Sequence, residues 1–337
     1  MKRELNEWDM LKVMAILCVV IGHVTIQFTS DRHPEQNTFI PQVITYIIYL
    51  FHMPLFMAIS GAIYQVGAMK GKYDNFSKFI VNKGKRLLVP YLFVGFVFLF
   101  PVLNFLQYGT INCVDISKAY DSLVLCHDTR HLWYLIALFW IFIFHYLMKY
   151  FKIPDWILLI GSIILALIAS VWKFPDLFCV NMAIGYYPYF LLGIILAQKH
   201  GTIKSLILSI VCVFICSIII YLQDLYVIDR LCSLLMTIGI VIMIVTCCRR
   251  FMKDKKSLYL SIKSHPLFLW LLDYSFVIYL FHEIVVMIYH KITFGVHWGI
   301  VLVSSFILSI VVSIIIGKTI RSIMLNALIG EKRVSYN

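Results

Sequence analysis

Long apolar runs, each bounded by charged or turn-forming residues, repeat along the whole chain. A bilayer core is about 30 Å thick and an α-helix rises about 1.5 Å per residue, so roughly 20 apolar residues predict a helix that crosses the membrane. The runs lie at residues 11–28, 42–64, 87–107, 132–148, 155–172, 180–198, 205–222, 231–248, 267–290 and 299–317. This pattern predicts an all-α, polytopic membrane helix bundle of about ten transmembrane helices, forming one domain over residues 1–337.

The basic residues indicate how this bundle is oriented. Most of the 29 Lys and Arg residues fall in loops on the same side of the membrane as the N-terminus. The opposite side holds the remaining ones, which are Arg32, Lys118, Arg130, Lys173, Arg230 and Lys291. Because cytoplasmic loops carry the excess of Lys and Arg, we expect both termini in the cytoplasm of a multi-pass protein of the inner (cytoplasmic) cell membrane.

The composition excludes a soluble globular protein. Hydrophobic residues make up 61% of the chain and charged residues only 14%, and the mean hydropathy is +0.89. The formal net charge of +12 would suggest nucleic-acid binding in a soluble protein. Here the lysines and arginines lie beside apolar runs, so we expect the lipid bilayer, and no nucleic acid, as their partner.

The cysteines show no metal-binding pattern. There are nine of them, without a CxxC pair, and most lie inside apolar runs, where cysteine behaves as a small hydrophobic residue. Cys113 and Cys126 share one predicted outer loop and could form a disulfide there. We therefore expect no metal, and the pairing of Cys113 with Cys126 stays open.

Ionisable residues inside apolar runs are costly and are candidates for function. Lys12 and His23 are separated by eleven positions in the first run, so both lie on one helix face, about 16 Å apart along the axis. They could line one cleft, with Asp9 at its inner end. The alternative is that His23 bonds a neighbouring helix and that Lys12 extends to the lipid headgroups.

A second candidate pair lies in the ninth run, where His282 and Glu283 are adjacent. Successive helical residues point about 100° apart, so we expect only one of the two to face the first helix. Glu283 could equally be a paired structural carboxylate.

Two loops carry further candidates. Lys83 and Arg86 form a basic cluster before the third run, which could seat a phosphorylated donor or could be ordinary positive-inside charge. His131, Trp133 and Tyr134 lie at the outer entry of the fourth run. Aromatic and polar side chains there suit a sugar, although aromatic residues at that depth also form interfacial belts.

Five segments in the right order resemble the acyltransferase-3 family, membrane O-acyltransferases that in bacteria modify surface and exported sugars. They are Trp8-Asp9-Met10-Leu11-Lys12 with Gly22-His23, Phe51-His52-Met53-Pro54 with Ser60-Gly61, Lys83 and Arg86 before Pro90, His131-Leu132-Trp133-Tyr134, and Ser275 to His282. Lys12 stands where arginine is usual in the family, which keeps the charge but loses the bidentate fork.

The resemblance implies transfer of an acyl group, most often acetyl, from acyl-CoA to a carbohydrate hydroxyl, with no permanently bound cofactor. Lys12, Lys83 and Arg86 would hold the nucleotide of the donor by charge-assisted hydrogen bonds. His23 would be the general base and His282 its partner, although an acyl-histidine intermediate is an open alternative. His131, Trp133, Tyr134, Glu283 and Asp9 would contact the acceptor.

Two other classes of function remain open from the sequence. A transporter of lipid-linked sugars could use buried His and Glu residues to relay protons, but such folds usually show internal repeats and none is evident here. A non-enzymatic membrane partner of a polysaccharide synthase would tolerate substitution of Lys12, His23 and Arg86, which catalysis would not.

Overall fold

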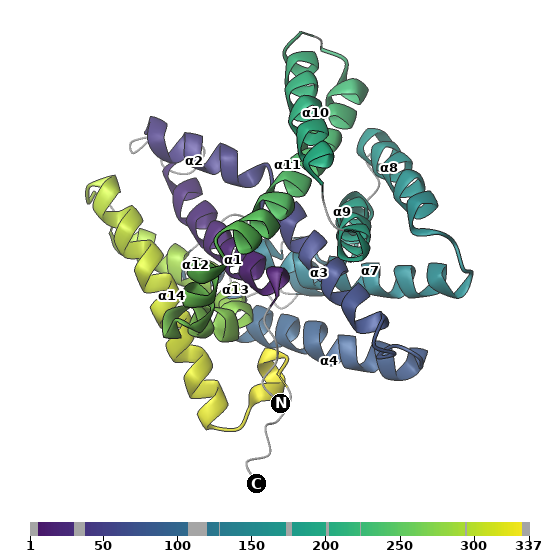
Figure 1. Ribbon diagram of the computed structural model, residues 1–337. Coiled ribbons are helices and arrows are strands. Elements are labelled where there is room, and N and C mark those ends of the chain that lie inside the picture. Colours follow the sequence, from purple (N-terminus) through teal and green to yellow (C-terminus); the bar gives the residue numbers. More distant parts are fainter. Residues whose placement is uncertain are drawn as a thin grey trace.

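The fold is a bundle of helices, seen in a computed structural model that describes residues 6–29, 38–106, 120–127, 129–172, 177–199, 202–222, 224–293 and 295–331 (Figure 1). No strand occurs in these residues. The α-helices are α1 (Glu7–Thr25), α2 (Phe39–Tyr49), α3 (His52–Ala68), α4 (Phe76–Val94), α5 (Phe100–Phe105), α7 (Trp133–Tyr150), α8 (Asp155–Trp172), α9 (Val180–Gln198), α10 (Ile203–Leu222), α11 (Tyr226–Asp254), α12 (Lys256–Ser264), α13 (Pro266–Ile292) and α14 (Trp298–Ser322).

Ten helical segments among the described residues are long and apolar enough to cross a membrane. Each overlaps one of the ten runs expected from the sequence, which confirms the all-α, multi-pass architecture. Some are longer than expected, because a hydropathy pattern marks only the apolar part of a helix. α4, for example, begins at Phe76, where the side chain of Asn75 caps it by accepting a hydrogen bond from the Lys78 N–H at 2.8 Å.

The second expected span is broken into two helices. α2 ends at Tyr49 and α3 begins at His52, with Phe51 between them outside helical geometry. The break places Pro54 in the first turn of α3, where a backbone N–H has no partner within the helix and proline is tolerated. Tyr49, which is exposed, and His52, which is buried, are thereby set at a bend between the two helices.

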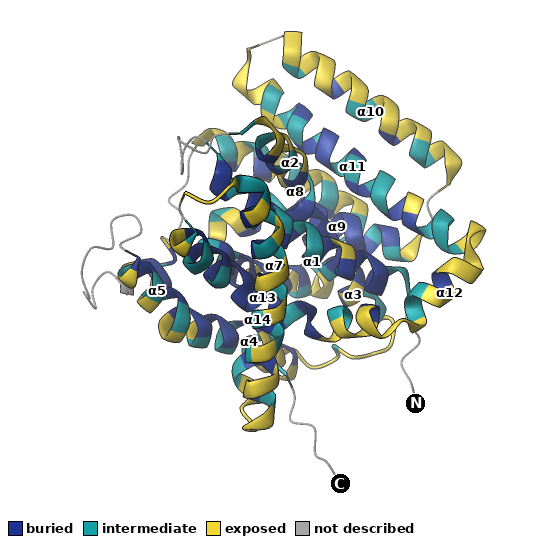
Figure 2. Cartoon of the chain, turned by 90° about the vertical axis from the view of Figure 1, so that its left-hand side faces the viewer, coloured by how far each residue is buried: buried dark blue, intermediate teal, exposed yellow. Residues whose placement is uncertain are grey.

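The helices form an inner group and a lipid-facing group (Figure 2). Of the most apolar 18 residues in each span, 67% are buried in α13 and 61% in α1, against 22% in α14 and 11% in α10. The apolar faces of α10 and α14 are therefore available to lipid. α1 and α13 are the helices best placed to carry polar side chains away from the bilayer.

Close helix contact depends on small residues where α3 crosses α9. A methyl group on Gly193 would lie 1.8 Å from the carbonyl oxygen of Ala58, and one on Gly61 would lie 1.9 Å from that of Phe190. The two backbones can approach this closely only because neither glycine has a side chain. This crossing fixes α3 beside α9.

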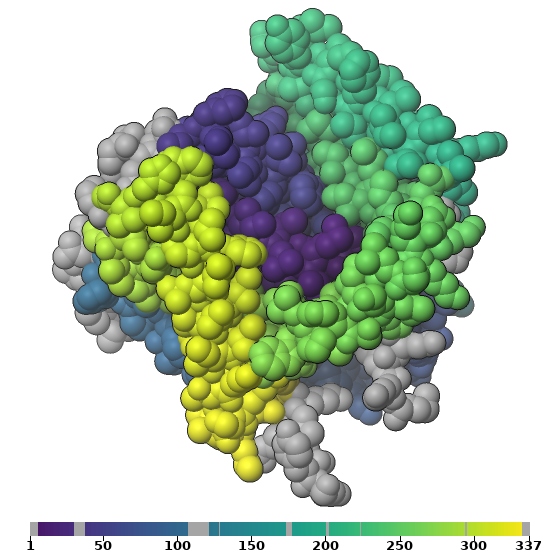
Figure 3. Space-filling view, turned by 60° about the vertical axis from the view of Figure 1, so that its left-hand side comes forward, coloured from purple at the N-terminus to yellow at the C-terminus, as the bar shows by residue number. Residues whose placement is uncertain are grey.

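The surface is hollowed next to α1. In Figure 3, α1 lies at the bottom of a hollow bordered by α14 on one side and by the α11–α12 segment on the other. The outward-facing residues of α1 include Met14, whose exposure is 45%. A helix at the centre of the bundle is thus reachable from one side.

Candidate active site

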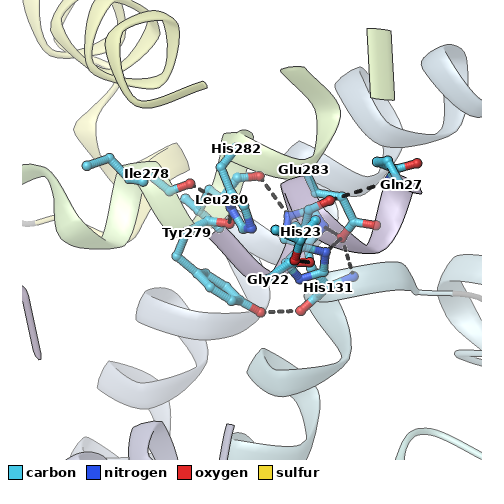
Figure 4. A network of polar contacts seen from close by, with 10 residues as sticks. Gly22, His23, Gln27, His131, Ile278, Tyr279, Leu280, His282 and Glu283 are labelled. Atoms are coloured by element: carbon cyan, nitrogen blue, oxygen red, sulfur yellow. Dashed lines mark hydrogen bonds and ion pairs between the residues drawn. The ribbon is translucent and has the colours of Figure 1, made fainter. Parts of the chain in front are cut away.

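Three segments that are distant in sequence bring four ionisable side chains together (Figure 4). His23 comes from α1, His131 from the 3₁₀ turn η5 (Arg130–Leu132), and His282 and Glu283 come from α13. The ring centroids of His23 and His282 are 5.0 Å apart, those of His131 and His282 are 5.2 Å apart, and those of His23 and His131 are 6.3 Å apart. The site is a compact cluster of three imidazoles around one carboxylate.

One oxygen of the Glu283 carboxylate holds this cluster together. Its Oε2 atom lies 2.9 Å from Nδ1 of His131 and 3.5 Å from Nδ1 of His23, and it accepts a hydrogen bond from the backbone N–H of His131 at 3.1 Å. Glu283 is 3% exposed. A buried carboxylate must be compensated by donors or positive charge, and here the two imidazoles and the amide provide that compensation.

The contacts of His131 place a proton between His131 and Glu283. Nε2 of His131 lies 3.0 Å from the carbonyl oxygen of Leu280, and because a carbonyl can only accept, Nε2 must carry a hydrogen. A lone pair on Nδ1 would then face a carboxylate oxygen at 2.9 Å, which is repulsive. A hydrogen on Nδ1 would instead face the negative charge of the Glu283 carboxylate, which is favourable.

His282 has a defined tautomer for the same reason. Its Nδ1 lies 2.9 Å from the carbonyl oxygens of both Ile278 and Tyr279, so the hydrogen is on Nδ1. Nε2 of His282 is buried and has no hydrogen-bond partner among the described residues. His282 thus presents a lone pair or a second N–H to the interior of the site, next to the ring of His23.

His23 is the member of the cluster that a substrate can reach. Its side chain is 16% exposed, whereas the side chains of His131 and Glu283 are 1% and 4% exposed and His282 is fully buried. The hydroxyl of Tyr279 donates a hydrogen bond to the backbone carbonyl of His131 and so helps to hold His131 in place. The buried residues orient the site and His23 forms its accessible side.

One expectation about α13 is wrong. Only one of His282 and Glu283 was expected to face α1, but both lie against His23. The two side chains diverge by about 100° around α13, and α1 lies between the two directions, so each of these long side chains reaches it.

Lys12 and Asp9 lie far from the cluster, towards the start of α1. Lys12 is half-buried, about 16 Å along the axis from His23. Asp9 is 2% exposed and completes a capping box, in which its Oδ2 accepts from the backbone N–H of Asn6 at 3.1 Å. Asp9 lies about 21 Å along α1 from His23.

Lys83 and Arg86 lie one turn apart on α4 but have different surroundings. Nζ of Lys83 is 3.5 Å from the ring centroid of Phe142, and the rings of Tyr73 and Phe79 are 5.3 and 5.4 Å away. These distances are typical of cation–π contacts. Arg86 is exposed. Arg86 is therefore accessible to a ligand, whereas the ammonium group of Lys83 packs against three aromatic rings.

Tyr134 and Trp133 continue the chain from His131 into α7. The hydroxyl of Tyr134 is 2.7 Å from Oγ of Ser60, and the residue is 6% exposed, so it packs within the bundle. Trp133 is half-buried, with its ring 4.8 Å from that of Tyr186. Neither side chain contacts Glu283 or His23 in the described set of contacts.

Two residues near His23 were not among the expected site residues. The side-chain amide of Gln27 donates to the carbonyl of His23 at 3.4 Å, and the ring of Tyr49 is 6.4 Å from the His23 ring. Gln27 is a polar residue four positions after His23 in an apolar run, and that spacing could have identified it. Tyr49 depends on the bend between α2 and α3, which the pattern does not reveal.

The remaining sequence expectations concern metals and cysteines. Among the residues that the structure describes, no group of three His, Cys, Asp or Glu side chains is placed to hold a metal ion. Cys113 lies outside the described residues, so its pairing with Cys126 stays a prediction.

Comparison with known proteins agrees with the resemblance seen in the sequence. Nodulation protein NolL of Sinorhizobium fredii is 29% identical to this chain over 195 residues, which is 57% of this chain and 48% of that protein. Nodulation protein NolL of Mesorhizobium japonicum is 27% identical over 203 residues, 58% of this chain and 48% of the relative. The chain thus spans about half the length of these curated relatives, and no solved structure matches it.

The family assignment covers nearly the whole chain. Residues 5–318 match the family described as an acyltransferase domain, and this stretch contains α1 to α13 and most of α14. His23, His131, His282 and Glu283 all lie within it. This multi-pass membrane protein therefore belongs to the acyltransferase-3 family.

Proposed function

We propose that the protein is a membrane O-acyltransferase that moves an acyl group, acetyl being the simplest, from acyl-CoA to a carbohydrate hydroxyl. The observation that carries the proposal is the contact between His23 and Glu283, at 3.5 Å, in a site where His23 alone of the four clustered residues is partly exposed. An imidazole that is accessible on one side and paired with a buried carboxylate on the other is the arrangement of a general base.

In the proposed reaction the acceptor hydroxyl attacks the carbonyl carbon of the thioester while His23 takes its proton. The carbon–sulfur bond then breaks, and the proton passes to the departing thiolate, which leaves as the free thiol of CoA. Glu283 stabilises the imidazolium of His23 while the proton is held there. This role differs from the acceptor contact expected of Glu283 from the sequence.

His131 and His282 act as positioning residues in this proposal. His131 shares the Glu283 oxygen with His23, so the position of the carboxylate depends on both imidazoles. His282 packs against the ring of His23 and, being fully buried, orients that ring from the interior of the site. Direct transfer and transfer through an acyl-histidine use the same groups.

We further propose that the donor enters from the cytoplasm, with both termini on that side of the inner membrane. The distribution of Lys and Arg supports this orientation. His23 lies about 24 Å along α1 from its start, so the thioester would have to cross much of the bilayer to reach it. The acceptor would then meet the acyl group in the outer half of the membrane.

The test is transfer of labelled acetyl from acetyl-CoA in membranes that carry the native protein or His23→Ala at matched levels, with a surface-glycan extract as acceptor. Label should enter glycan with the native protein only. Equal incorporation by His23→Ala would remove His23 from the chemistry, and no incorporation by either would favour transport of sugar intermediates instead.

A further inference from the structure

A concavity of about 610 Å³ opens where the start of α1 meets the end of α11 and the start of α10. Its polar lining is Glu7 of α1 and Thr246, Arg249, Arg250 and Lys253 of α11. The α11 positions follow a spacing of three, four and seven residues, which places them on one face of that helix. None of them belongs to the cluster around His23.

Arg249 forms the fixed wall of this concavity. Its guanidinium donates to Oε1 of Glu7 at 3.2 and 3.3 Å, to the carbonyl of Leu196 at 2.7 Å and to that of Lys199 at 3.1 Å. These bonds tie α11 to α1 and to the end of α9. They also pair the positive charge of Arg249 with the carboxylate of Glu7.

Arg250 and Lys253 therefore give the concavity an excess of positive charge. Neither forms an ion pair with any residue in the part of the chain that the structure describes, and both line the concavity. Arg250 is half-buried and Lys253 is exposed at the rim. Because Arg249 is already paired with Glu7, the charges of Arg250 and Lys253 remain to attract a ligand that carries negative charge.

Thr246 is an independent sign that the concavity binds a ligand. It is 1% exposed, lines the concavity, and its Oγ1 has no hydrogen-bond partner among the described residues. A buried hydroxyl is normally satisfied, and in a membrane helix it commonly bonds a backbone carbonyl one turn earlier. An oxygen-rich ligand in the concavity would satisfy it.

We infer that this concavity binds a phosphate group of the nucleotide end of the acyl-CoA donor. The inference rests on the proposed function. Glu7 is five residues before Lys12, so the concavity lies at the same end of α1 as the cation that the family resemblance implies for the donor. The same chemistry would also suit the phosphate of a membrane phospholipid, and the experiment must distinguish the two sources.

The test is equilibrium binding of labelled CoA to the purified full-length protein in zwitterionic phosphatidylcholine nanodiscs. Arg250→Ala/Lys253→Ala should weaken binding at least tenfold, and the isosteric Thr246→Val should weaken it about threefold. Lys255→Ala/Lys256→Ala is the matched control, because it removes two exposed lysines just beyond the concavity, and its affinity should stay within twofold of native. For CoA that lacks the 3′-phosphate, the affinities of the native protein and of Arg250→Ala/Lys253→Ala should differ less than they do for CoA itself.

The lipid source is tested by native mass spectrometry of the same variants from nanodiscs that contain phosphatidylglycerol. Loss of bound phosphatidylglycerol from Arg250→Ala/Lys253→Ala, with unchanged CoA affinity, overturns the assignment to the donor in favour of a lipid. Unchanged CoA affinity and unchanged lipid retention overturn the site altogether. Absence of CoA binding by the native protein would contradict the proposed donor, and this result is distinct from one that contradicts only the proposed site.

Discussion

Replacing Glu283 by glutamine removes one negative charge from the buried centre of the site and keeps the shape of the side chain. Oε2 of Glu283 lies 3.5 Å from Nδ1 of His23, so the charge acts directly on any proton that His23 takes from a substrate. The amide of glutamine can still accept from the backbone N–H of His131, which now holds Oε2 at 3.1 Å. The change therefore tests the charge more than the packing.

The expected effect follows from the 3.5 Å separation. At an effective dielectric constant of about 20, two unit charges at that distance interact by about 5 kcal/mol. Each 1.36 kcal/mol on the barrier corresponds to about tenfold in rate, so complete loss of this interaction would slow the reaction by three to four orders of magnitude. Since His23 is partly exposed and the amide dipole remains, we expect a fall in kcat of about 10²- to 10³-fold.

The assay is acetyl transfer by purified native and Glu283→Gln protein at saturating acetyl-CoA. A matched control is Asp273→Asn, the same chemical change on the same helix, where the carboxylate is 62% exposed and pairs with Arg321 at 2.5 Å. The control should retain at least half of the native rate. A Glu283→Gln protein that is folded and transfers acetyl within threefold of the native rate would refute the assigned role of the carboxylate.

Three further predictions concern the bundle around the site. Gly193→Ala should lower the melting temperature by several degrees, because the added methyl group meets a backbone carbonyl at 1.8 Å, whereas Gly185→Ala, which meets no described atom within 4 Å, should leave it unchanged. Tyr134→Phe should lower the melting temperature slightly and leave the KM for the acceptor unchanged if the tyrosine only packs, since its hydroxyl is already bonded within the bundle; a rise in that KM would support the acceptor contact expected from the sequence. An impermeant maleimide added outside cells should label His297→Cys but not Lys255→Cys in a cysteine-free background, and the reverse pattern would contradict the proposed orientation.

The helices were predictable because the bilayer imposes a length and an apolar composition on every span. The break between α2 and α3 was less predictable, because the segment is one continuous apolar run. A proline such as Pro54 can occur either inside a kinked helix or in the first turn of a new helix. The true start of α4 lay outside the prediction because its first turns carry Lys and Arg beyond the apolar stretch.

The site was predictable in its members but not in their arrangement. His23, His282 and Glu283 could be identified because an ionisable residue in an apolar run is costly, and His131 because it lies beside aromatic residues at the entry of such a run. Their meeting depends on how α1, η5 and α13 pack, which spacing within one helix does not specify. Similarly, the aromatic enclosure of Lys83 involves Phe142, 59 positions away on α7, and could not be seen from the basic loop alone.

The position of the bound acyl group shows directly whether His23 meets the thioester. A cryo-electron microscopy structure of the full-length protein with a non-transferable ketone analogue of acetyl-CoA would show where the carbonyl lies. We expect this carbonyl beside the exposed edge of His23, with Glu283 on the opposite side of the ring. An analogue bound in an ordered pose with its carbonyl on another part of the bundle, away from His23, would contradict the proposed role of His23.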